Sequence, residues 1–214
     1  MAERFLTGAG KGPGSAWPWR WLRRLGLYPL LAALSARKVR IANSSMYPLL
    51  APGDELLFDR LAYQGEAPRR GDIVLVEWMG LPEPRLVKLL AGLPGERIEV
   101  RQDRLWVDGR RLAFPQPIVG SLPGRWQLGP DEYFLFSHNV AVGSDSRHFG
   151  PVPRQALRAR AWLLLSPASR RRALRGIPLE VEPAPAGPSG GAGPPASGPP
   201  GRTATDPGTS STRV

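Results

Sequence analysis

Short apolar runs, separated by glycine, proline and aspartate, fill the chain from residue 37 to residue 165. Each run has the length of a β-strand, and the region lacks the longer periodicity of helices. The pair Asp108-Gly109 between two such runs is typical of a hairpin turn. This spacing favours a mainly β domain, a barrel or a sandwich. The predicted strands are residues 37–41, 55–59, 72–78, 86–90, 97–100, 104–107, 112–113, 133–136 and 159–165.

The two ends of the chain lack this pattern. Residues 1–16 are rich in glycine and polar side chains, and we expect a flexible N-terminus. Residues 17–36 join tryptophans and arginines to an apolar run shorter than the about 20 residues of a spanning helix. This composition is typical of a short membrane-associating segment, with a helix packed on the domain as the alternative. Residues 180–214, rich in proline and glycine, predict a disordered tail, so residues 37–179 form the expected folded domain.

The charge and the cysteine content narrow the function classes. The net charge is +11, carried mainly by arginine, which suits an anionic membrane surface or nucleic acid. The arginines are not interleaved with aromatic residues as in RNA-binding proteins, so we expect no nucleic-acid partner. The chain has no cysteine, which excludes disulfides, thiolate zinc sites and cysteine nucleophiles.

Histidine chemistry has only two candidates, His138 and His148. A Ser-His-Asp triad would have to use one of them. For His148, a surface or hydrogen-bonded loop position is the simpler interpretation. Two histidines without a third ligand pattern predict no metal site, and no cofactor is expected.

A turn after the first predicted strand carries two hydroxyls. Residues 43–48 read Asn-Ser-Ser-Met-Tyr-Pro, in which Pro48 fixes its own φ and keeps Tyr47 extended. A serine displayed on such a turn is a candidate nucleophile, although Ser-Ser beside proline also occurs in ordinary loops.

Lys88 is the candidate base, one of only three lysines in the chain beside Lys11 and Lys38. On a strand, its side chain would share a face with Leu86 and Leu90. If that face is the core, burial lowers the pKa of the amine, and a neutral lysine can deprotonate a serine hydroxyl. The alternative is an edge-strand lysine that points into water.

Four stretches of the chain resemble, in order, the motif boxes of the type I signal peptidases, membrane-associated Ser/Lys proteases that release signal peptides. The first resembles the nucleophile box, the second a Gly-Asp-Ile-Val strand, the third the lysine box and the fourth the final Asp-Ser-Arg box. These stretches are residues 45–49, 70–74, 87–96 and 143–152. The resemblance covers roughly residues 37–165 and implies the β fold of that family.

The resemblance also implies roles for individual residues. Ser45 would be the nucleophile and Lys88 the general base. The backbone N–H of Ser45 and the side chain of Asn43 would hold the oxyanion, since an asparagine amide can donate where the family more often has serine or glycine. Met46 would line the shallow groove that binds the substrate.

The final box implies structural roles and carries departures from the family. Asp145 and Arg147 resemble the family's structural ion pair behind the dyad. The family's Gly-Asp-Asn-Arg is replaced by residues 137–140, Ser-His-Asn-Val, which keep only the asparagine. The serine that commonly orients the lysine falls at Gly143, and Ser144 beside it is the candidate substitute.

The implied function is a signal peptidase I-like serine endopeptidase, a hydrolase that cleaves exported preproteins after small residues. The protein would be a monomer at the cell membrane, with its catalytic domain on the outer face. One alternative is a cytoplasmic protease that matures one dedicated precursor, such as the propeptide of nickel superoxide dismutase. Another is an inactive basic β-domain that binds a membrane or nucleic acid.

Overall fold

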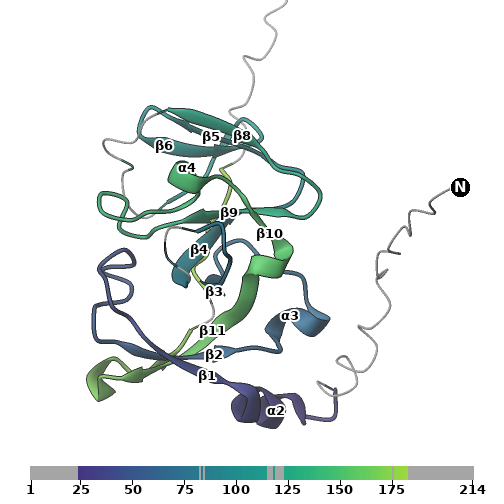
Figure 1. Ribbon diagram of the computed structural model, residues 1–214, viewed down its shortest axis with the longest axis vertical. Coiled ribbons are helices and arrows are strands. Elements are labelled where there is room, and N and C mark those ends of the chain that lie inside the picture. Colours follow the sequence, from purple (N-terminus) through teal and green to yellow (C-terminus); the bar gives the residue numbers. More distant parts are fainter. Residues whose placement is uncertain are drawn as a thin grey trace, which may run out of the picture. The chain divides into compact units, whose positions relative to one another are not determined.

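The computed structural model describes residues 24–81, 83, 85–114, 118, 123–174 and 176–182. Two sheets and a few short helices make up this part of the chain (Figure 1). The prediction of a mainly β domain is confirmed. The predicted flexible residues 1–16, the first part of segment 17–36 and the tail from residue 183 onward lie outside the described residues.

The larger sheet has eight strands in the order β1-β2-β11-β3-β4-β9-β10, with β12 paired to β11. All of its pairings are antiparallel. The strand bounds are β1 (Arg37–Arg40), β2 (Glu55–Asp59), β3 (Ile73–Val76), β4 (Leu86–Gly92), β9 (Glu132–Phe136), β10 (Val152–Pro153), β11 (Leu157–Ser166) and β12 (Arg172–Ala173). Strand β1 therefore lies at one edge, whereas β4 lies in the interior of the sheet.

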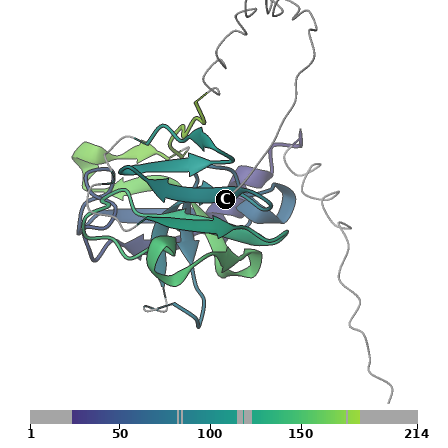
Figure 2. The same ribbon diagram turned by 90° about the horizontal axis from the view of Figure 1, so that it is seen from above.

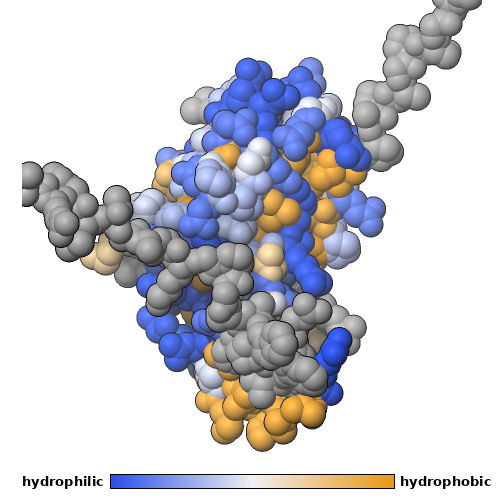
Figure 3. Space-filling view, turned by 90° about the vertical axis from the view of Figure 1, so that its right-hand side faces the viewer, coloured by the Kyte–Doolittle hydropathy of each residue, from blue (hydrophilic) through white to orange (hydrophobic). Residues whose placement is uncertain are grey.

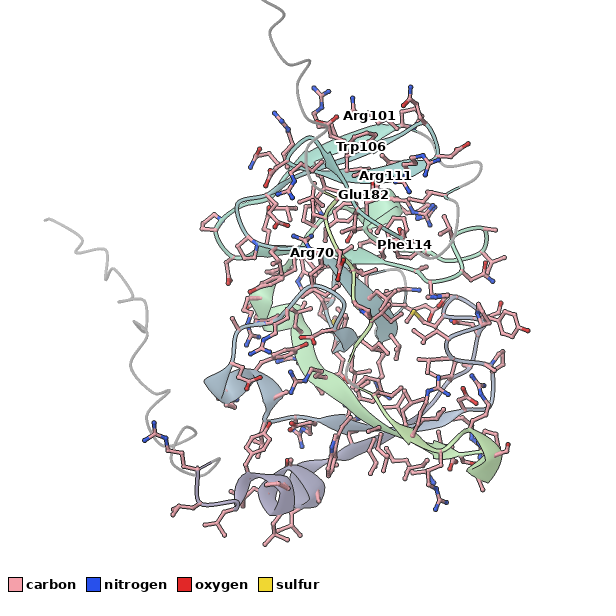
Figure 4. All side chains as sticks on the ribbon, turned by 180° about the vertical axis from the view of Figure 1, so that it is seen from behind. Arg70, Arg101, Trp106, Arg111, Phe114 and Glu182 are labelled. Carbon is pink, nitrogen blue, oxygen red and sulfur yellow. The ribbon has the colours of Figure 1, made fainter. Side chains whose placement is uncertain are left out.

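The smaller sheet has four strands in the order β7-β6-β5-β8, with bounds β5 (Arg97–Arg101), β6 (Arg104–Val107), β7 (Arg110–Arg111) and β8 (Gly124–Gln127). Seen from above, the strands of this sheet, drawn in teal, lie in front of the rest of the domain (Figure 2). The guanidinium of Arg101 lies 4.1 Å from the ring centre of Trp106 on this sheet, a cation–π contact (Figure 4).

One predicted strand is wrong. The returning strand of the hairpin is predicted at residues 112–113, but that strand, β7, consists of Arg110–Arg111, and of the predicted pair only Leu112 continues its pairing with β6, through an N–H donated to the Leu105 carbonyl at 2.8 Å. Asp108 and Gly109 both have positive φ, 49° and 75°, so the turn is only two residues long and pairing resumes at once with Val107 opposite Arg110. The other predicted strands are present with small shifts of their ends, and β8, β10 and β12 were not predicted.

The segment after β12 joins the two sheets. The Ile177 N–H donates to the Gly71 carbonyl at 2.9 Å, and farther on Leu112 and Val181 form a β-bridge. A Cβ on Gly71, whose φ is +86°, would lie 1.8 Å from the Ile177 carbonyl oxygen, so this crossing requires glycine. Arg111 and Glu182 form an ion pair of 3.0 Å (Figure 4). Residues 180–182, which the sequence assigned to the tail, thus belong to the folded part.

The core covers both faces of the larger sheet. On one face, a cluster joins β2, β3 and β11 to the loop before β2 through residues such as Phe58 and Met46, and a second cluster joins the smaller sheet to β9 through Ile98 and Phe134. A third cluster, which includes Val74 and Leu135, covers the opposite face. The partly buried Phe114 packs against the first two clusters. Burial of this continuous apolar surface is the main stabilising term of the fold.

The described part of segment 17–36 contains helix α2 (Tyr28–Ser35). The helix is anchored to the domain by buried Ala32 and by a hydrogen bond from the Tyr28 hydroxyl to Asp59. Its outer side shows as an apolar cluster at the lower end of Figure 3, formed by Leu30 and Leu34, which are 60% and 77% exposed. Within the described residues, no helix combines the length and apolar character needed to cross a membrane.

Candidate active site

Ser45 lies in the loop between β1 and β2. The Leu50 N–H donates to the Met46 carbonyl, and the Tyr47 N–H donates to the Ser44 carbonyl, which closes the loop into tight turns. Met46 and Leu50 are buried, so they fix the loop on the core. The Tyr47-Pro48 peptide bond is cis. These contacts hold Ser45 at the surface of the core with 6% of its area exposed.

Lys88 comes from strand β4, which lies between β3 and β9. Its side chain is 2% exposed, so the alternative of an edge-strand lysine pointing into water is wrong. Burial lowers the pKa of Lys88 from 10.5 to about 8, while the nearby carboxylates of Asp145 and Glu83 oppose this shift. The amine is therefore neutral to about a tenth at pH 7 and to about half at pH 8, far more than for an exposed lysine.

The structure brings these two residues together. The Nζ atom of Lys88 lies 2.9 Å from the Oγ of Ser45, in a buried hydrogen bond. This distance permits proton transfer from the hydroxyl to a neutral amine. The two groups thus have the spacing that a serine nucleophile and a lysine general base would need.

Asn43 makes a second contact with Ser45. Its Oδ1 accepts from the Ser45 hydroxyl at 2.9 Å and from the Ser45 N–H at 3.3 Å. The structure therefore has Asn43 presenting an acceptor to Ser45, whereas an oxyanion requires a donor. The side chain of Asn43 is exposed, so its amide is free to turn and present Nδ2.

The loop after β9 packs against the loop that carries Ser45. The Asn139 N–H donates to the Ser45 carbonyl at 2.8 Å. Asp145, fully buried at the start of α4 (Ser146–Phe149), accepts from the Ser137 N–H at 2.8 Å. Asp145 and Arg147 form a bidentate ion pair of 2.8 and 2.9 Å, and Arg147 also donates to the Val140 carbonyl. This network fixes the loop of residues 137–145 against Ser45.

The remaining residues of the final box lie differently. Ser144 is exposed, so the structure does not support it as the residue that orients Lys88. Gly143 is buried and faces Ser137, whose hydroxyl is buried without a hydrogen-bond partner. In the sequence, Ser137 stands out only as a departure from the family's motif. The signal available there was a serine in place of glycine, six positions before a glycine in place of serine.

The two histidines have other contacts. His148 caps α4, with its Nδ1 accepting from the Asp145 N–H at 3.3 Å, and Nδ1 of His138 lies 3.2 Å from the Tyr47 carbonyl oxygen. His148 is exposed and hydrogen-bonded as expected, although it lies in the short helix α4 rather than in a loop. The described residues contain no group of three or more potential ligands that could hold a metal ion.

A groove of about 340 Å³ runs past Ser45. Its walls come from residues 38–43 on one side and residues 85–88 on the other, and Met46 also lines it. Since β1 is an edge strand, the first wall offers backbone groups to an extended chain. A larger hollow of about 900 Å³ shares Glu83 and Arg85 with the groove. The serine therefore faces a space suited to a peptide.

The chain is similar in sequence to several known proteins. The family model described as "Signal peptidase, peptidase S26" matches residues 17–165. A probable signal peptidase I-2 of Synechocystis sp. is 29% identical over 188 residues, which cover 79% of this chain and 84% of that protein. Signal peptidase I of Leptolyngbya laminosa is 30% identical over 165 residues, covering 70% and 80% respectively.

A crystal structure of a signal peptidase I from Enterococcus faecalis has a TM-score of 0.39 and 23% identity, covering 44% of this chain and 97% of that one. The match to the family model extends over more than half of the sequence, from the segment before α2 to the end of β11. The chain belongs to the signal peptidase family, peptidase S26.

Proposed function

We propose that this signal peptidase family member cleaves signal peptides from exported preproteins with Ser45 as nucleophile and Lys88 as general base. The observation that carries the proposal is the 2.9 Å hydrogen bond between Lys88 Nζ and Ser45 Oγ. It is supported by the burial of Lys88, which favours the neutral amine. Burial also keeps bulk water from competing for the amine.

The first half of the reaction forms an acyl-enzyme. Neutral Lys88 takes the proton of the Ser45 hydroxyl while Oγ attacks the scissile carbonyl carbon. The tetrahedral intermediate collapses, the peptide C–N bond breaks, and the Lys88 ammonium returns the proton to the leaving amine. In the second half, Lys88 deprotonates a water molecule that attacks the ester, and the proton then returns to the Ser45 oxygen.

The oxyanion of the intermediate needs donors that the resting site does not offer. The Ser45 N–H is engaged with Asn43 Oδ1, and that contact is long at 3.3 Å. When a substrate carbonyl oxygen enters, a turn of the Asn43 amide releases the Ser45 N–H and presents Nδ2 beside it. Two donors directed at the developing charge would stabilise the transition state.

The groove supports a peptide substrate in extended form. Residues 39–41 at the edge of the larger sheet can pair with the backbone of the preprotein as an added strand. The family's preference for small residues before the cleavage site implies small side chains next to the scissile bond.

We place the protein at a membrane surface, with the catalytic domain on the face where exported preproteins emerge. Four exposed leucines support this placement. Leu30 and Leu34 lie on helix α2, and Leu25 and Leu27 lie directly before it. Such a patch gains free energy by entering the interfacial region of a bilayer. The positive net charge of +11 favours anionic lipid.

The test is cleavage of a preprotein with an Ala-x-Ala site by the detergent-solubilised protein. Wild type should cleave at one bond, and Ser45→Ala and Lys88→Ala should each lose cleavage by at least about 10³-fold. Ser44→Ala is the matched control, because it removes the neighbouring hydroxyl, and it should retain wild-type activity.

Two results would contradict the proposal. Cleavage that survives Ser45→Ala means that another residue is the nucleophile. A folded wild type that leaves the preprotein intact means that the protein is not a general signal peptidase, and the same variants should then be tested on a dedicated propeptide substrate.

A further inference from the structure

The hydroxyl of Ser137 is buried without a hydrogen-bond partner, which destabilises the folded protein. The residue is fully buried, and its Oγ has no hydrogen-bond partner. A buried hydroxyl without a partner costs about 1–3 kcal/mol relative to one that is hydrogen-bonded. Burial of this kind at the edge of an active site calls for a functional explanation.

The strand register brings Ser137 next to Lys88. Leu89 of β4 pairs with Phe136 of β9 in an antiparallel ladder. One step along, Lys88 is opposite Ser137, and directly opposite residues project from the same face of a sheet with Cβ atoms about 5 Å apart. Asp145 links the two independently, since its carboxylate accepts from the Ser137 N–H and acts electrostatically on Lys88.

Lys88 in turn lacks partners. In the structure Lys88 Nζ donates one N–H to Ser45 Oγ, whose own proton goes to Asn43 Oδ1. Even a neutral amine then has a second N–H donor. Within the part of the chain that the structure describes, Nζ has one hydrogen-bond partner, the Ser45 hydroxyl. The site thus contains a buried donor that needs an acceptor and, across one strand pair, a buried hydroxyl that needs a partner.

Gly143 makes room for the Ser137 side chain. A Cβ on Gly143 would lie 2.0 Å from the Oγ of Ser137 and 2.2 Å from its Cβ. Side chains at positions 137 and 143 therefore compete for one space beside Lys88. The carbonyl oxygen of Asn139 lies 2.9 Å from this Cβ position of Gly143. A hydroxyl in this space can therefore donate its proton to the Asn139 carbonyl.

We propose that Ser137 is the positioning residue of Lys88: its hydroxyl turns to accept an N–H of the amine and directs the lone pair toward Ser45. The proposal rests on the proposed Ser45–Lys88 mechanism. It explains how the site works with glycine at position 143, because the orienting hydroxyl reaches the same space from β9 instead.

The experiment measures kcat, KM and the pH profile of preprotein cleavage for three variants. Ser137→Ala should lower kcat by about 10- to 100-fold, part of the 10²–10⁴-fold that a general base contributes, with KM unchanged. It should also move the acidic limb of the kcat/KM profile to lower pH, because the hydroxyl stabilises the ammonium more than the amine. Gly143→Ser alone should be impaired by overlap with Ser137, and Ser137→Gly combined with Gly143→Ser should recover activity.

Several outcomes would overturn the proposal. Ser137→Ala with wild-type kcat and pH profile removes the role altogether. Loss of activity with a lowered Tm and an unmoved pH limb assigns Ser137 a packing role only. A folded double variant as inactive as Gly143→Ser shows that the two positions do not share one function. Failure of the dyad itself is distinguishable, since Ser45→Ala or Lys88→Ala would then remain active.

Discussion

The Nζ of Lys88 lies 2.9 Å from the Oγ of Ser45, although 43 positions of sequence separate the two residues. Ser45 comes from a loop that is fixed by its own buried residues, and Lys88 comes from an interior strand of the larger sheet. The contact therefore exists only when the loop is docked on β4. Loss of that docking would separate the proposed nucleophile from the proposed base without changing either residue.

Cleavage should increase with pH through the pKa of Lys88. Because that pKa is about 8, most of the amine is protonated at pH 6 and unable to accept the Ser45 proton. We expect kcat/KM to rise about tenfold per pH unit below pH 8 and to level off above it. The measurement is the pH profile of preprotein cleavage, with the stability of the fold checked at each pH. A rate that stays constant from pH 6 to pH 9 would contradict a lysine base of this pKa.

Lys88→Met should abolish cleavage and stabilise the fold. The pKa of Lys88 is about 8 in the folded protein and 10.5 when exposed, so between these values the unfolded chain binds more protons and stability rises with pH. At pH 7 the buried amine costs roughly 3 kcal/mol, at about 1.4 kcal/mol per pH unit. Methionine removes this cost while keeping the volume.

Urea unfolding of wild type and Lys88→Met measures this effect. The difference in unfolding free energy should be largest below pH 8 and shrink toward pH 10. A Lys88→Met variant that is less stable than wild type at pH 7 would show that the amine is better solvated or paired than its burial indicates.

The Asn43 side chain should be needed as a donor. Asn43→Ala should lower kcat by about 10²–10³-fold, the range for loss of one oxyanion donor. Asn43→Asp keeps the acceptor that contacts Ser45 in the resting site but removes the donor, so it should be as defective as alanine. Asn43→Ser should recover part of the activity. Wild-type kcat for Asn43→Asp would show that the acceptor contact, and not oxyanion binding, is the role of this residue.

The ion pair of Asp145 and Arg147 should matter far more than an exposed pair. Arg147→Ala leaves the buried carboxylate of Asp145 without its partner and should lower the unfolding free energy by about 3–5 kcal/mol. Arg111→Ala, which breaks the exposed pair with Glu182, is the matched control and should change it by less than about 1 kcal/mol. Both variants are compared with wild type in thermal and urea unfolding. If Arg147→Ala and Arg111→Ala lower the unfolding free energy equally, the loop network is not important for stability.

The outer side of α2 should determine membrane binding. Changing both Leu30 and Leu34 to aspartate removes two exposed apolar side chains without disturbing the core, and should weaken binding to anionic vesicles by at least about 10-fold. Met79→Asp is the control, because Met79 is 96% exposed and lies outside α2. Cleavage of a short soluble peptide should remain unchanged in the double variant. Vesicle flotation that does not distinguish the two variants would place the membrane contact elsewhere.

Much of the fold could be predicted from the local sequence. The sequence predicted a mainly β domain because its apolar runs are short and are separated by turns rich in glycine and proline. Runs of this kind form strands rather than helices. The error at residues 112–113 arose because the run is apolar, while the tight turn at Asp108-Gly109 starts the pairing earlier. Leu112 is buried instead by pairing with Val181, a contact that local pattern does not reveal.

For the site, too, some features follow from the sequence and others only from the tertiary structure. The sequence by itself determined which residues are the candidates for the chemistry, since Ser45 and Lys88 stand in motif boxes whose order and spacing are local properties. Only the tertiary structure decided that Lys88 is buried in an interior strand, that Asn43 turns its oxygen toward Ser45, and that Ser137 and Gly143 share one space. These features depend on strand register and on the packing of distant segments, and small changes in that packing decide whether a hydroxyl is solvated, paired or left without a partner.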